Sequence, residues 1–536
     1  MLLKKLKRKL KHMSKTSIVI TILVFIVLSC MATGYAVLNQ KLNIFGNANI
    51  VIPDYRIYVS NVTVESATNG GYATSTATHS GTEVALYTTL PNNNSSVTYE
   101  ITLNNIGNSA AIADYIYVSS DNNFVKYKIK EINSKDIISK MSERKILVTV
   151  EPCENVSTNN LISSIILNFS FIKYFEGYSN ECTLSWDGSS SQTPISTNIL
   201  GITYYQISNA NEFKWFIDQV NSGNTGINIM LTKDICLNDK AFTSIADSTT
   251  YTGIFDGQNR TIKGINFSRN KEISSGDETY QMGFIKNNGG IIKNVNISAT
   301  YSDIHTTVAR ENTSYIGGVV VNNSGIIENV SFSGTITLNA TARVNCSIRQ
   351  SHTTNYIGGI AASNTGIIRG SSNKAVFNLT GKTEKKTCNI YSRSSNIYAG
   401  GIASTNSGYI VDSYNSSTIS VSGSNESDTR TTNTAKIGGL VSTNNSQISN
   451  AYTSGAISQT ISGEGDFDFT TDTIGINNGN TSNVYYVSGS ISTLPSSPIG
   501  TLVSATDLIN LNVPIGNAFK LDNKNINNGY PILFWQ

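Results

Sequence analysis

Five segments of this chain align on a glycine followed by a large apolar residue, and this repeat constrains the fold more firmly than any single motif. The aligned glycines are Gly283, Gly318, Gly359, Gly401 and Gly439, at spacings of 35, 41, 42 and 38 residues. A period between about 20 and 50 residues is typical of solenoids and propellers. Since one copy cannot bury its own apolar edge, we expect successive copies to stack around a shared core.

Inside each copy, residues at fixed distances from the glycine keep their type. We number the places of each copy from its aligned glycine. The residue at place one is apolar and the residue at place nine is isoleucine, so we expect both to point inward. Place five is asparagine, whose amide can bond to equivalent asparagines in the coils above and below. The asparagines are Asn288, Asn323, Asn364, Asn406 and Asn444, and the isoleucines are Ile292, Ile327, Ile368, Ile410 and Ile448. A sixth, degenerate copy is expected to begin at Gly475.

The segment between places five and nine is expected to reverse the chain. Place seven is glycine in the first four copies and Ser446 in the fifth. Because Asn and Gly tolerate positive φ, we expect that conformation here. The spacings exceed the needs of a minimal coil, so each coil should carry a hairpin or long loop on one side. The alternating stretch from Thr335 to Val344 is an example.

We expect the β-helix to span residues 203–500 and to be covered at both ends, because open solenoid ends invite edge pairing. Asn211 is predicted to cap a short helix that ends at Gly223. The apolar face of that helix would consist of Phe213, Phe216, Ile217 and Val220. Residues 501–536 are expected to cover the far end.

Two of the six cysteines occupy matching places in neighbouring repeats. Cys346 lies 28 places after its glycine and Cys388 lies 29 places after its own. We hypothesise a disulfide between them, with free thiols as the alternative. No Cys-x-x-Cys pair occurs, so no zinc site is expected.

The N-terminus has the pattern of a membrane anchor. Seven lysines and arginines and no acidic residue precede residue 16, and Ile18 to Val37 is mostly apolar. About 20 such residues span a bilayer, and the basic flank stays in the cytoplasm. We therefore expect a cytoplasmic segment at 1–16, a transmembrane signal anchor at 17–38 and an extracellular bulk. Lipidation at Cys30 and ordinary signal cleavage near Gly34 to Ala36 remain open alternatives.

Without the seven N-terminal cations, the chain has 32 basic and 36 acidic residues. This balance gives no basic footprint for nucleic acid, and we expect no such partner.

Residues 51–180 have the alternation of short antiparallel strands. Stretches such as Val97 to Leu103 and Ile165 to Ile172 alternate, with Asn-rich turns between them. We expect a β-sandwich. The stretch from Tyr99 to Tyr117 resembles immunoglobulin-like bacterial surface modules, which implies a stalk. Residues 181–202, rich in Ser and Gly, are expected to form a flexible linker.

Several runs of the repeats resemble the GLUG-motif repeats of bacterial surface proteins. These are Ile316-Gly317-Gly318-Val319, Ile357-Gly358-Gly359-Ile360 and Ile437-Gly438-Gly439-Leu440-Val441. The opening Gly253 to Ile262 and the closing Asn528 to Trp535 are similar to the ends of such regions. The resemblance covers about residues 203–536. It implies a β-helical solenoid on the cell surface and says little about activity.

Candidate chemistry is sparse. Some GLUG-motif proteins are zinc peptidases, but none of the four histidines, His12, His79, His305 and His352, forms the His-Glu-x-x-His pattern. Asp256 is interpreted as a structural Asx-turn. Asp466, Asp468 and Asp472 are a weak calcium candidate, with a solvated loop as the favoured interpretation. We expect no cofactor.

These observations favour a membrane-tethered, non-enzymatic surface protein. It would bind an extracellular glycan, or a surface protein of a host or bacterium, through loops on the solenoid. The alternatives are a carbohydrate-active enzyme, which would need clustered carboxylates in a groove, and a purely structural envelope protein.

Overall fold

The computed structural model describes residues 55–120, 122, 124–132, 136–152, 160–173, 186–199, 201–241, 243–308, 310–344, 350–385, 392–426 and 431–536. Within these ranges, no helix has both the length and the apolar character needed to cross a bilayer. The predicted segments 1–16 and 17–38, together with Cys30, Cys346 and Cys388, lie outside them.

The N-terminal module consists of two antiparallel sheets around one apolar core. One sheet has the order β1-β5-β9-β7 and the other β2-β4-β10-β6-β8, with β3 beside β4. The strands are β1 (Ile57–Thr68), β2 (Tyr72–Ala73), β3 (Thr78–Ser80), β4 (Glu83–Leu90), β5 (Ser96–Asn105), β6 (Ala111–Ser120), β7 (Val125–Lys130), β8 (Ile137–Ile138), β9 (Ser142–Pro152) and β10 (Leu161–Lys173). Alternation places Val97, Tyr99, Ile101 and Leu103 of β5 in the core. The sequence therefore predicts these two layers correctly.

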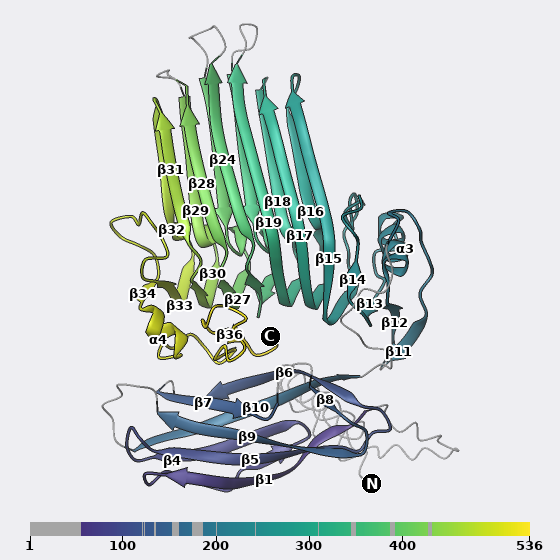
Figure 1. The fold of residues 1–536 in the computed structure, drawn as a ribbon, viewed down its shortest axis with the longest axis vertical. Coiled ribbons are helices and arrows are strands. Elements are labelled where there is room, and N and C mark those ends of the chain that lie inside the picture. The colour runs from purple at the N-terminus through teal and green to yellow at the C-terminus, as the bar shows by residue number, and fades with distance from the viewer. Residues whose placement is uncertain are drawn as a thin grey trace, which may run out of the picture. The chain divides into compact units, whose positions relative to one another are not determined.

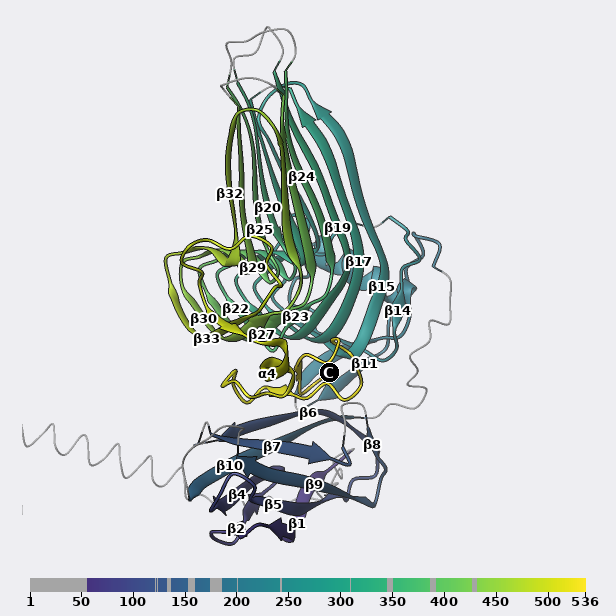
Figure 2. The same cartoon turned by 60° about the vertical axis from the view of Figure 1, so that its left-hand side comes forward.

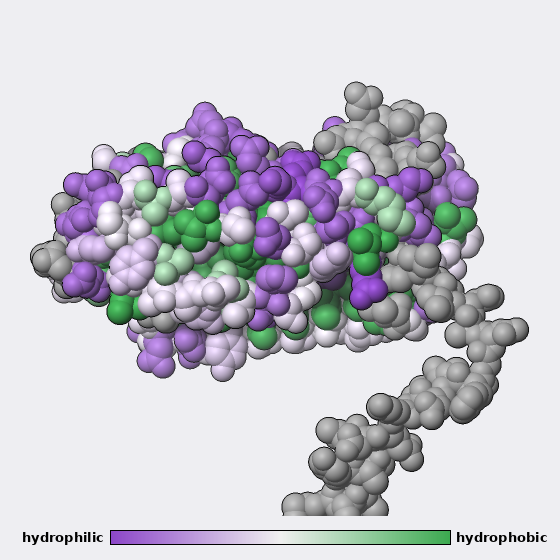
Figure 3. Space-filling model, turned by 90° about the horizontal axis from the view of Figure 1, so that it is seen from below, coloured by the Kyte–Doolittle hydropathy of each residue, from purple (hydrophilic) through white to green (hydrophobic). Residues whose placement is uncertain are grey.

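Some apolar side chains of this module remain exposed, among them Val64, Tyr72 and Ile162. Figure 3, which views the molecule from below, shows apolar residues in green dispersed among polar ones. Single exposed apolar residues are normal on protein surfaces.

The expected β-solenoid is confirmed: two sheets run through the repeat region (Figure 1), and all their strand pairings are parallel except that of β11 with β12. The first sheet contains β11 (Ser196–Ile199), β12 (Ile202–Ile207), β13 (Ile229–Leu231), β14 (Ile235–Cys236), β15 (Ile254–Ile273), β17 (Ile291–Thr307), β19 (Ile326–Val344), β22 (Ile367–Arg369), β23 (Ser372–Asn373), β24 (Val376–Lys385), β27 (Tyr409–Asn415), β28 (Thr418–Asn425), β30 (Gln447–Thr453), β31 (Ile457–Gly463), β33 (Asn480–Val487) and β34 (Thr501–Val503). The second contains β16 (Glu278–Asn288), β18 (Arg310–Asn323), β20 (Gln350–Gly358), β21 (Ala361–Asn364), β25 (Ser392–Gly400), β26 (Ala403–Asn406), β29 (Thr431–Asn444) and β32 (Asp466–Asn477). We call them the first and second solenoid sheets.

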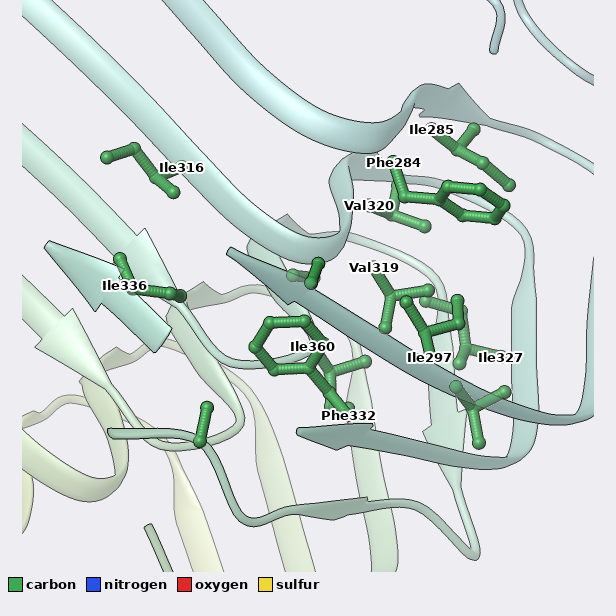
Figure 4. Packing of buried hydrophobic residues seen from close by; sticks show 14 of the residues in the cluster. Phe284, Ile285, Ile297, Ile316, Val319, Val320, Ile327, Phe332, Ile336 and Ile360 are labelled. Atoms are coloured by element: carbon green, nitrogen blue, oxygen red, sulfur yellow. The ribbon is translucent and has the colours of Figure 1, made fainter. Parts of the chain in front are cut away.

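The apolar residues of successive coils form continuous inward rows. All five residues at place one and all five at place nine are fully buried. Figure 4 shows Phe284, Val319 and Ile360, from three successive coils, in one shared core. Ile292 pairs with Ile327 and Ile327 with Ile368, so the rows follow the strand register.

The place-five asparagines form the expected ladder. Each Nδ2 donates to the Oδ1 of the next coil's asparagine at 2.8 Å, from Asn288 through Asn323, Asn364, Asn406 and Asn444 to Asn477. Asn477 thus belongs to the sixth copy. In that copy Asp472 and Thr473 stand where the fifth copy has Gly438 and Gly439. The sixth copy therefore begins before Gly475, and the predicted start at Gly475 is wrong.

The expectation of positive φ between places five and nine is also wrong. Neither the asparagines nor the glycines there have positive φ. The glycines are required by close approach instead, since a Cβ on Gly366 would lie 2.1 Å from the carbonyl oxygen of Gly325 in the preceding coil. Left-handed residues occur at place eleven, in a row formed by Asn294, Asn329, Gly370, Asp412 and Asn450.

Each coil extends into a tall arm, visible in Figures 1 and 2. The rising strand of an arm, such as β17, belongs to the first solenoid sheet, and the descending strand, such as β18, belongs to the second. The two strands pair with neighbouring coils and not with each other, so the arm is a β-arch and not a hairpin, one of the two forms expected for the extra residues of each coil.

The interior of the arms contains a buried polar network. Arg269 donates from Nε and Nη2 to the two carboxylate oxygens of Asp303 at 2.7 and 2.9 Å. Its Nη1 bonds to Glu278 at 3.1 Å and its Nη2 to the hydroxyl of Ser314 at 2.9 Å, while His305 Nδ1 lies 3.2 Å from Asp303. Burial alone would raise the pKa of Asp303, but its bonds with His305 and Arg269 hold that pKa below the usual value.

The entry to the solenoid carries the expected helix, shifted by two residues. Helix α3 (Ala210–Asn221) is capped by Asn209, whose Oδ1 accepts from the Glu212 backbone N–H at 3.0 Å, so the prediction of Asn211 as the cap is wrong. The ring of Phe213 stacks on Phe284 with centroids 5.8 Å apart. Trp186, expected in a flexible linker, is buried in the same core.

The C-terminal segment includes α4 (Ala505–Ile509), β35 (Phe519–Lys520) and β36 (Ile532–Leu533). Strand β34 adds one more parallel strand beyond β33. The rest packs along the side of the stack, where Trp535 Nε1 donates to the Gly370 carbonyl at 2.7 Å. The segment therefore covers several coils laterally, in addition to the end at which it was expected.

We predict that Asn364→Leu lowers the free energy of unfolding by about 3 kcal/mol, because two buried partners, Asn323 Nδ2 and Asn406 Oδ1, each lose a bond. Chemical denaturation followed by circular dichroism measures this. Asn339→Leu, at an exposed position of β19, is the control and should change stability by less than about 0.5 kcal/mol. Equal losses in both variants would contradict the role of the ladder.

We also predict an acid-sensitive contribution from Asp303. Because its folded-state pKa lies below the unfolded value of about 3.9, the unfolded chain binds the proton first as pH falls. The contribution is complete above that value and is lost as pH falls through the folded-state pKa. Unfolding measured from pH 6 to pH 2 should show a shallower pH dependence in Asp303→Asn. An unchanged slope would contradict this assignment.

Candidate functional site

The outer face of the second solenoid sheet carries one tyrosine from each of three consecutive coils. Tyr315 of β18 pairs in register with Tyr356 of β20, and Tyr356 pairs with Tyr398 of β25. Residues alternate between the faces of a strand, so these rings point outward while Ile316 and Ile357 beside them are fully buried. We call the three residues the open tyrosine row.

The rings of the open tyrosine row stack on one another. The centroids of Tyr315 and Tyr356 lie 5.0 Å apart with planes 11° from parallel, and those of Tyr356 and Tyr398 lie 5.2 Å apart at 15°. Stacking covers the ring faces and leaves the edges and hydroxyls to face outward. Within the part of the chain that the structure describes, none of the three hydroxyls bonds to another residue.

Two members of the open tyrosine row, Tyr356 and Tyr398, have raised pKa values. Burial raises the pKa of Tyr356, and its neighbours Tyr315 and Tyr398 raise it further. Burial likewise raises the pKa of Tyr398, with a contribution from Asp468. These two phenols therefore keep their protons and can both donate and accept a hydrogen bond.

A second row of small polar residues runs beside the tyrosines. Thr313, Thr354, Asn396 and Thr434 pair in register, two positions before the tyrosine row on each strand. Asn396 Nδ2 lies 3.4 Å from the Thr354 hydroxyl. This row supplies further uncharged donors and acceptors at the spacing of the strands.

A third row begins with His352 and Ser394, whose side chains bond at 2.7 Å between Nδ1 and Oγ. Burial lowers the pKa of His352, although Glu311 opposes the shift, so this imidazole is neutral near pH 7. At the far end, Lys436 follows Tyr398 in register and forms an ion pair with Asp468 at 2.5 Å. The surface between Glu311 and Lys436 is thus uncharged.

A second set of tyrosines shows what such stacked rings can bind. Tyr414 and Tyr452 of the first solenoid sheet stack with centroids 5.2 Å apart, and Tyr485 follows in register. We call these three residues the covered tyrosine row, because the C-terminal segment buries them. Tyr414 donates to Gln536 Oε1 at 2.9 Å, and Tyr452 bonds to the Pro531 carbonyl. Stacked phenols in this chain therefore bind amide and carbonyl groups that pass their outer edges.

The three predicted calcium ligands are not brought together. Among the described residues, no group of three His, Cys, Asp or Glu side chains is arranged to hold a metal ion. Asp468 is engaged by Lys436, and the buried Asp472 accepts backbone N–H groups of Thr473 and Ile499 at 2.6 and 3.0 Å. The calcium candidate is therefore wrong, because the oxygens of Asp468 and Asp472 are engaged by different partners and do not converge on one point.

Several other carboxylates of the solenoid lie in pairs with cations. Asp256 accepts from the Gln258 N–H at 3.1 Å, as an Asx-turn does, and its other oxygen lies 3.2 Å from Lys293. Three further pairs join Glu328 to Arg369, Glu384 to Arg343 and Asp303 to Arg269. These carboxylates are spread along the stack as ion pairs.

The sequence contains a signal for the open tyrosine row that repeat matching on glycine overlooks. Tyr315, Tyr356 and Tyr398 each stand three places before the aligned glycine of their copy. The hypothesised disulfide between Cys346 and Cys388 falls outside the described residues, whereas Cys236 is disulfide-bonded.

Comparison with known proteins gives no match: neither a family model, nor a curated protein, nor a solved structure is similar to this chain.

We predict that the two tyrosine rows differ in their effect on stability. Tyr452→Phe removes a buried hydroxyl that bonds to Pro531 and Asn527, and should cost about 1–2 kcal/mol. Tyr356→Phe removes a hydroxyl with no partner and should change stability by less than about 0.5 kcal/mol. Thermal and urea unfolding measure both, and an equal loss would show that the open row also has a structural role.

Proposed function

We propose that this chain is a membrane-tethered cell-surface protein that binds an extracellular glycan through the open tyrosine row. The observation that carries the proposal is the open tyrosine row, whose stacked rings have hydroxyls without a partner among the described residues. We call this row, together with the polar row beside it, the strip. A protein surface that holds polar groups in fixed positions without using them internally is prepared to bind a polar ligand.

The chemistry of the strip favours a glycan. A sugar presents hydroxyl groups around an apolar ring, and the strip offers phenol, threonine and asparagine groups beside aromatic edges. Among the described residues of the second solenoid sheet that face outward between Glu311 and Lys436, there is no lysine or arginine that could bind a phosphate backbone. The distribution of solenoid carboxylates as ion pairs with lysine and arginine favours binding over hydrolysis, which uses two carboxyl groups on either side of one bond.

Two observations support an extracellular site. Cys236 is disulfide-bonded, and such bonds persist mainly in oxidising compartments. The basic N-terminal arm followed by an apolar segment fits a retained anchor with the bulk outside. The resemblance of the repeats to GLUG-motif surface proteins agrees with this placement. The antiparallel module at residues 55–173 would then act as a stalk.

The full-length chain, purified in detergent micelles, should bind at least one glycan on a broad array. Replacing Tyr315, Tyr356 and Tyr398 together by alanine should weaken that binding roughly tenfold or more, because aromatic anchors at the centre of a contact dominate affinity. Tyr409→Ala is the matched control, since Tyr409 is an exposed tyrosine of β27 outside the strip. The proposal fails if no glycan is bound, or if the triple variant and the control bind equally well.

A further inference from the structure

We infer that the ligand of the open tyrosine row is a linear, neutral, β-1,4-linked glycan that lies along the solenoid axis with one sugar per coil. This inference rests on the proposed function and adds the linkage, direction and charge of the ligand. It follows from the regular spacing of the strip, from its lack of free charge and from the contacts of the covered tyrosine row.

The spacing of the rings selects the kind of polymer. Successive rings are 5.0 and 5.2 Å apart, which follows the separation of about 4.8 Å between paired strands. An extended glycan with equatorial linkages, as in β-1,4 chains, advances by nearly this distance per sugar. It can therefore place one sugar at each coil, with alternate sugars turned over so that successive coils meet opposite edges of the chain. α-1,4-Linked chains coil and lose this register.

An extended peptide does not fit the same spacing. It advances by about 3.4 Å per residue as a strand and about 3.1 Å as a polyproline helix, so its groups drift out of register after one coil. The covered tyrosine row illustrates this. Its contacts come from Gln536 on Tyr414, Pro531 on Tyr452 and Pro514 on Tyr485, which are irregularly spaced along the C-terminal segment. A peptide reaches successive rings only by folding back.

Each coil of the strip offers one sugar a matched pair of groups. The tyrosine supplies an aromatic edge and a hydroxyl, and the residue two positions earlier supplies a smaller donor or acceptor. The pairs are Tyr315 with Thr313, Tyr356 with Thr354 and Tyr398 with Asn396. Figure 2 shows β20 and β25 side by side in the layer that bears this face.

The residues at the two ends of the strip limit its length and indicate that its ligand is uncharged. Gln281 precedes Tyr315 in register and Lys436 follows Tyr398, so the tyrosines end at these two coils. The ammonium group of Lys436 is taken up by Asp468 and by the Thr470 hydroxyl at 3.1 Å. It is therefore already compensated, and a ligand with carboxylate groups gains no advantage over a neutral one.

Titration calorimetry on the full-length chain in micelles tests the inference with defined oligosaccharides. The probes are cello- and chito-oligosaccharides of two to six sugars, with malto-oligosaccharides of equal length as the α-linked control. Affinity for at least one β-linked series should rise with each added sugar until three to five are present, and then level off. The α-linked series should bind at least about tenfold more weakly at the same length.

Variants of the central ring separate the inference from the proposed function. Tyr356→Ala should lower the affinity for the pentasaccharide about tenfold and abolish the dependence on length, because it splits the strip, whereas Tyr409→Ala should change neither. Tyr356→Phe keeps the ring stack and should give an intermediate loss. If the chain binds glycans but its affinity does not depend on the length of the oligosaccharide, or is equal for α-linked and β-linked oligomers, only this inference is overturned. Binding of no glycan overturns the proposed function with it.

Discussion

The repeat region depends on parallel pairing between identical places of successive coils. Backbone bonds alone would tolerate a slip of one coil against the next, but the asparagine ladder does not. A slip of one residue would place Ser363 or Thr365, which point to the other face of the strand, opposite Asn323 and break the amide bond to Asn364. The glycines at place seven add a steric condition, since they lie where a neighbour's carbonyl approaches too closely for any side chain. Together these contacts fix the register on which every outward-facing row relies.

The same register produces both the core and the open tyrosine row that we propose as a binding site. Alternation along β18, β20 and β25 directs Ile316 and Ile357 inward and the tyrosines outward, so one pairing rule aligns both sets. The strand pairing that orders the core also holds the outward row in place, so no further conformational entropy is lost to order that row. A preorganised site loses little conformational entropy when a ligand binds, which suits a surface built for repeated weak contacts.

Much of this arrangement could be read from the sequence, because places one, five and nine hold the same residue type in every copy. The arms could not, since alternation from Thr335 to Val344 is compatible with a hairpin or with a β-arch, and only pairing between coils decides. The role of Gly366 was misjudged because sequence does not distinguish a glycine needed for its φ from one needed for space. The open tyrosine row was overlooked because the repeats were matched on glycine, asparagine and isoleucine. Sequence spacing alone would also have misplaced Tyr280, which stands three places before Gly283 but pairs with Ser314 and lies outside the row. The sequence of the C-terminal segment has no periodic pattern, so its path along the side of the stack could not be predicted.

The β-arches have a consequence for how such a molecule can change over generations. Since the two strands of an arm do not pair with each other, the strand pairing of each repeat leads to its neighbours, and one whole repeat is a unit of construction. Duplicating a unit in the gene inserts a coil without disturbing the others, provided that it carries the same asparagine and glycines. Such a duplication also lengthens the outward row by one ring. The length of the outward row can therefore change with the number of repeats, while the contacts within the other repeats stay the same.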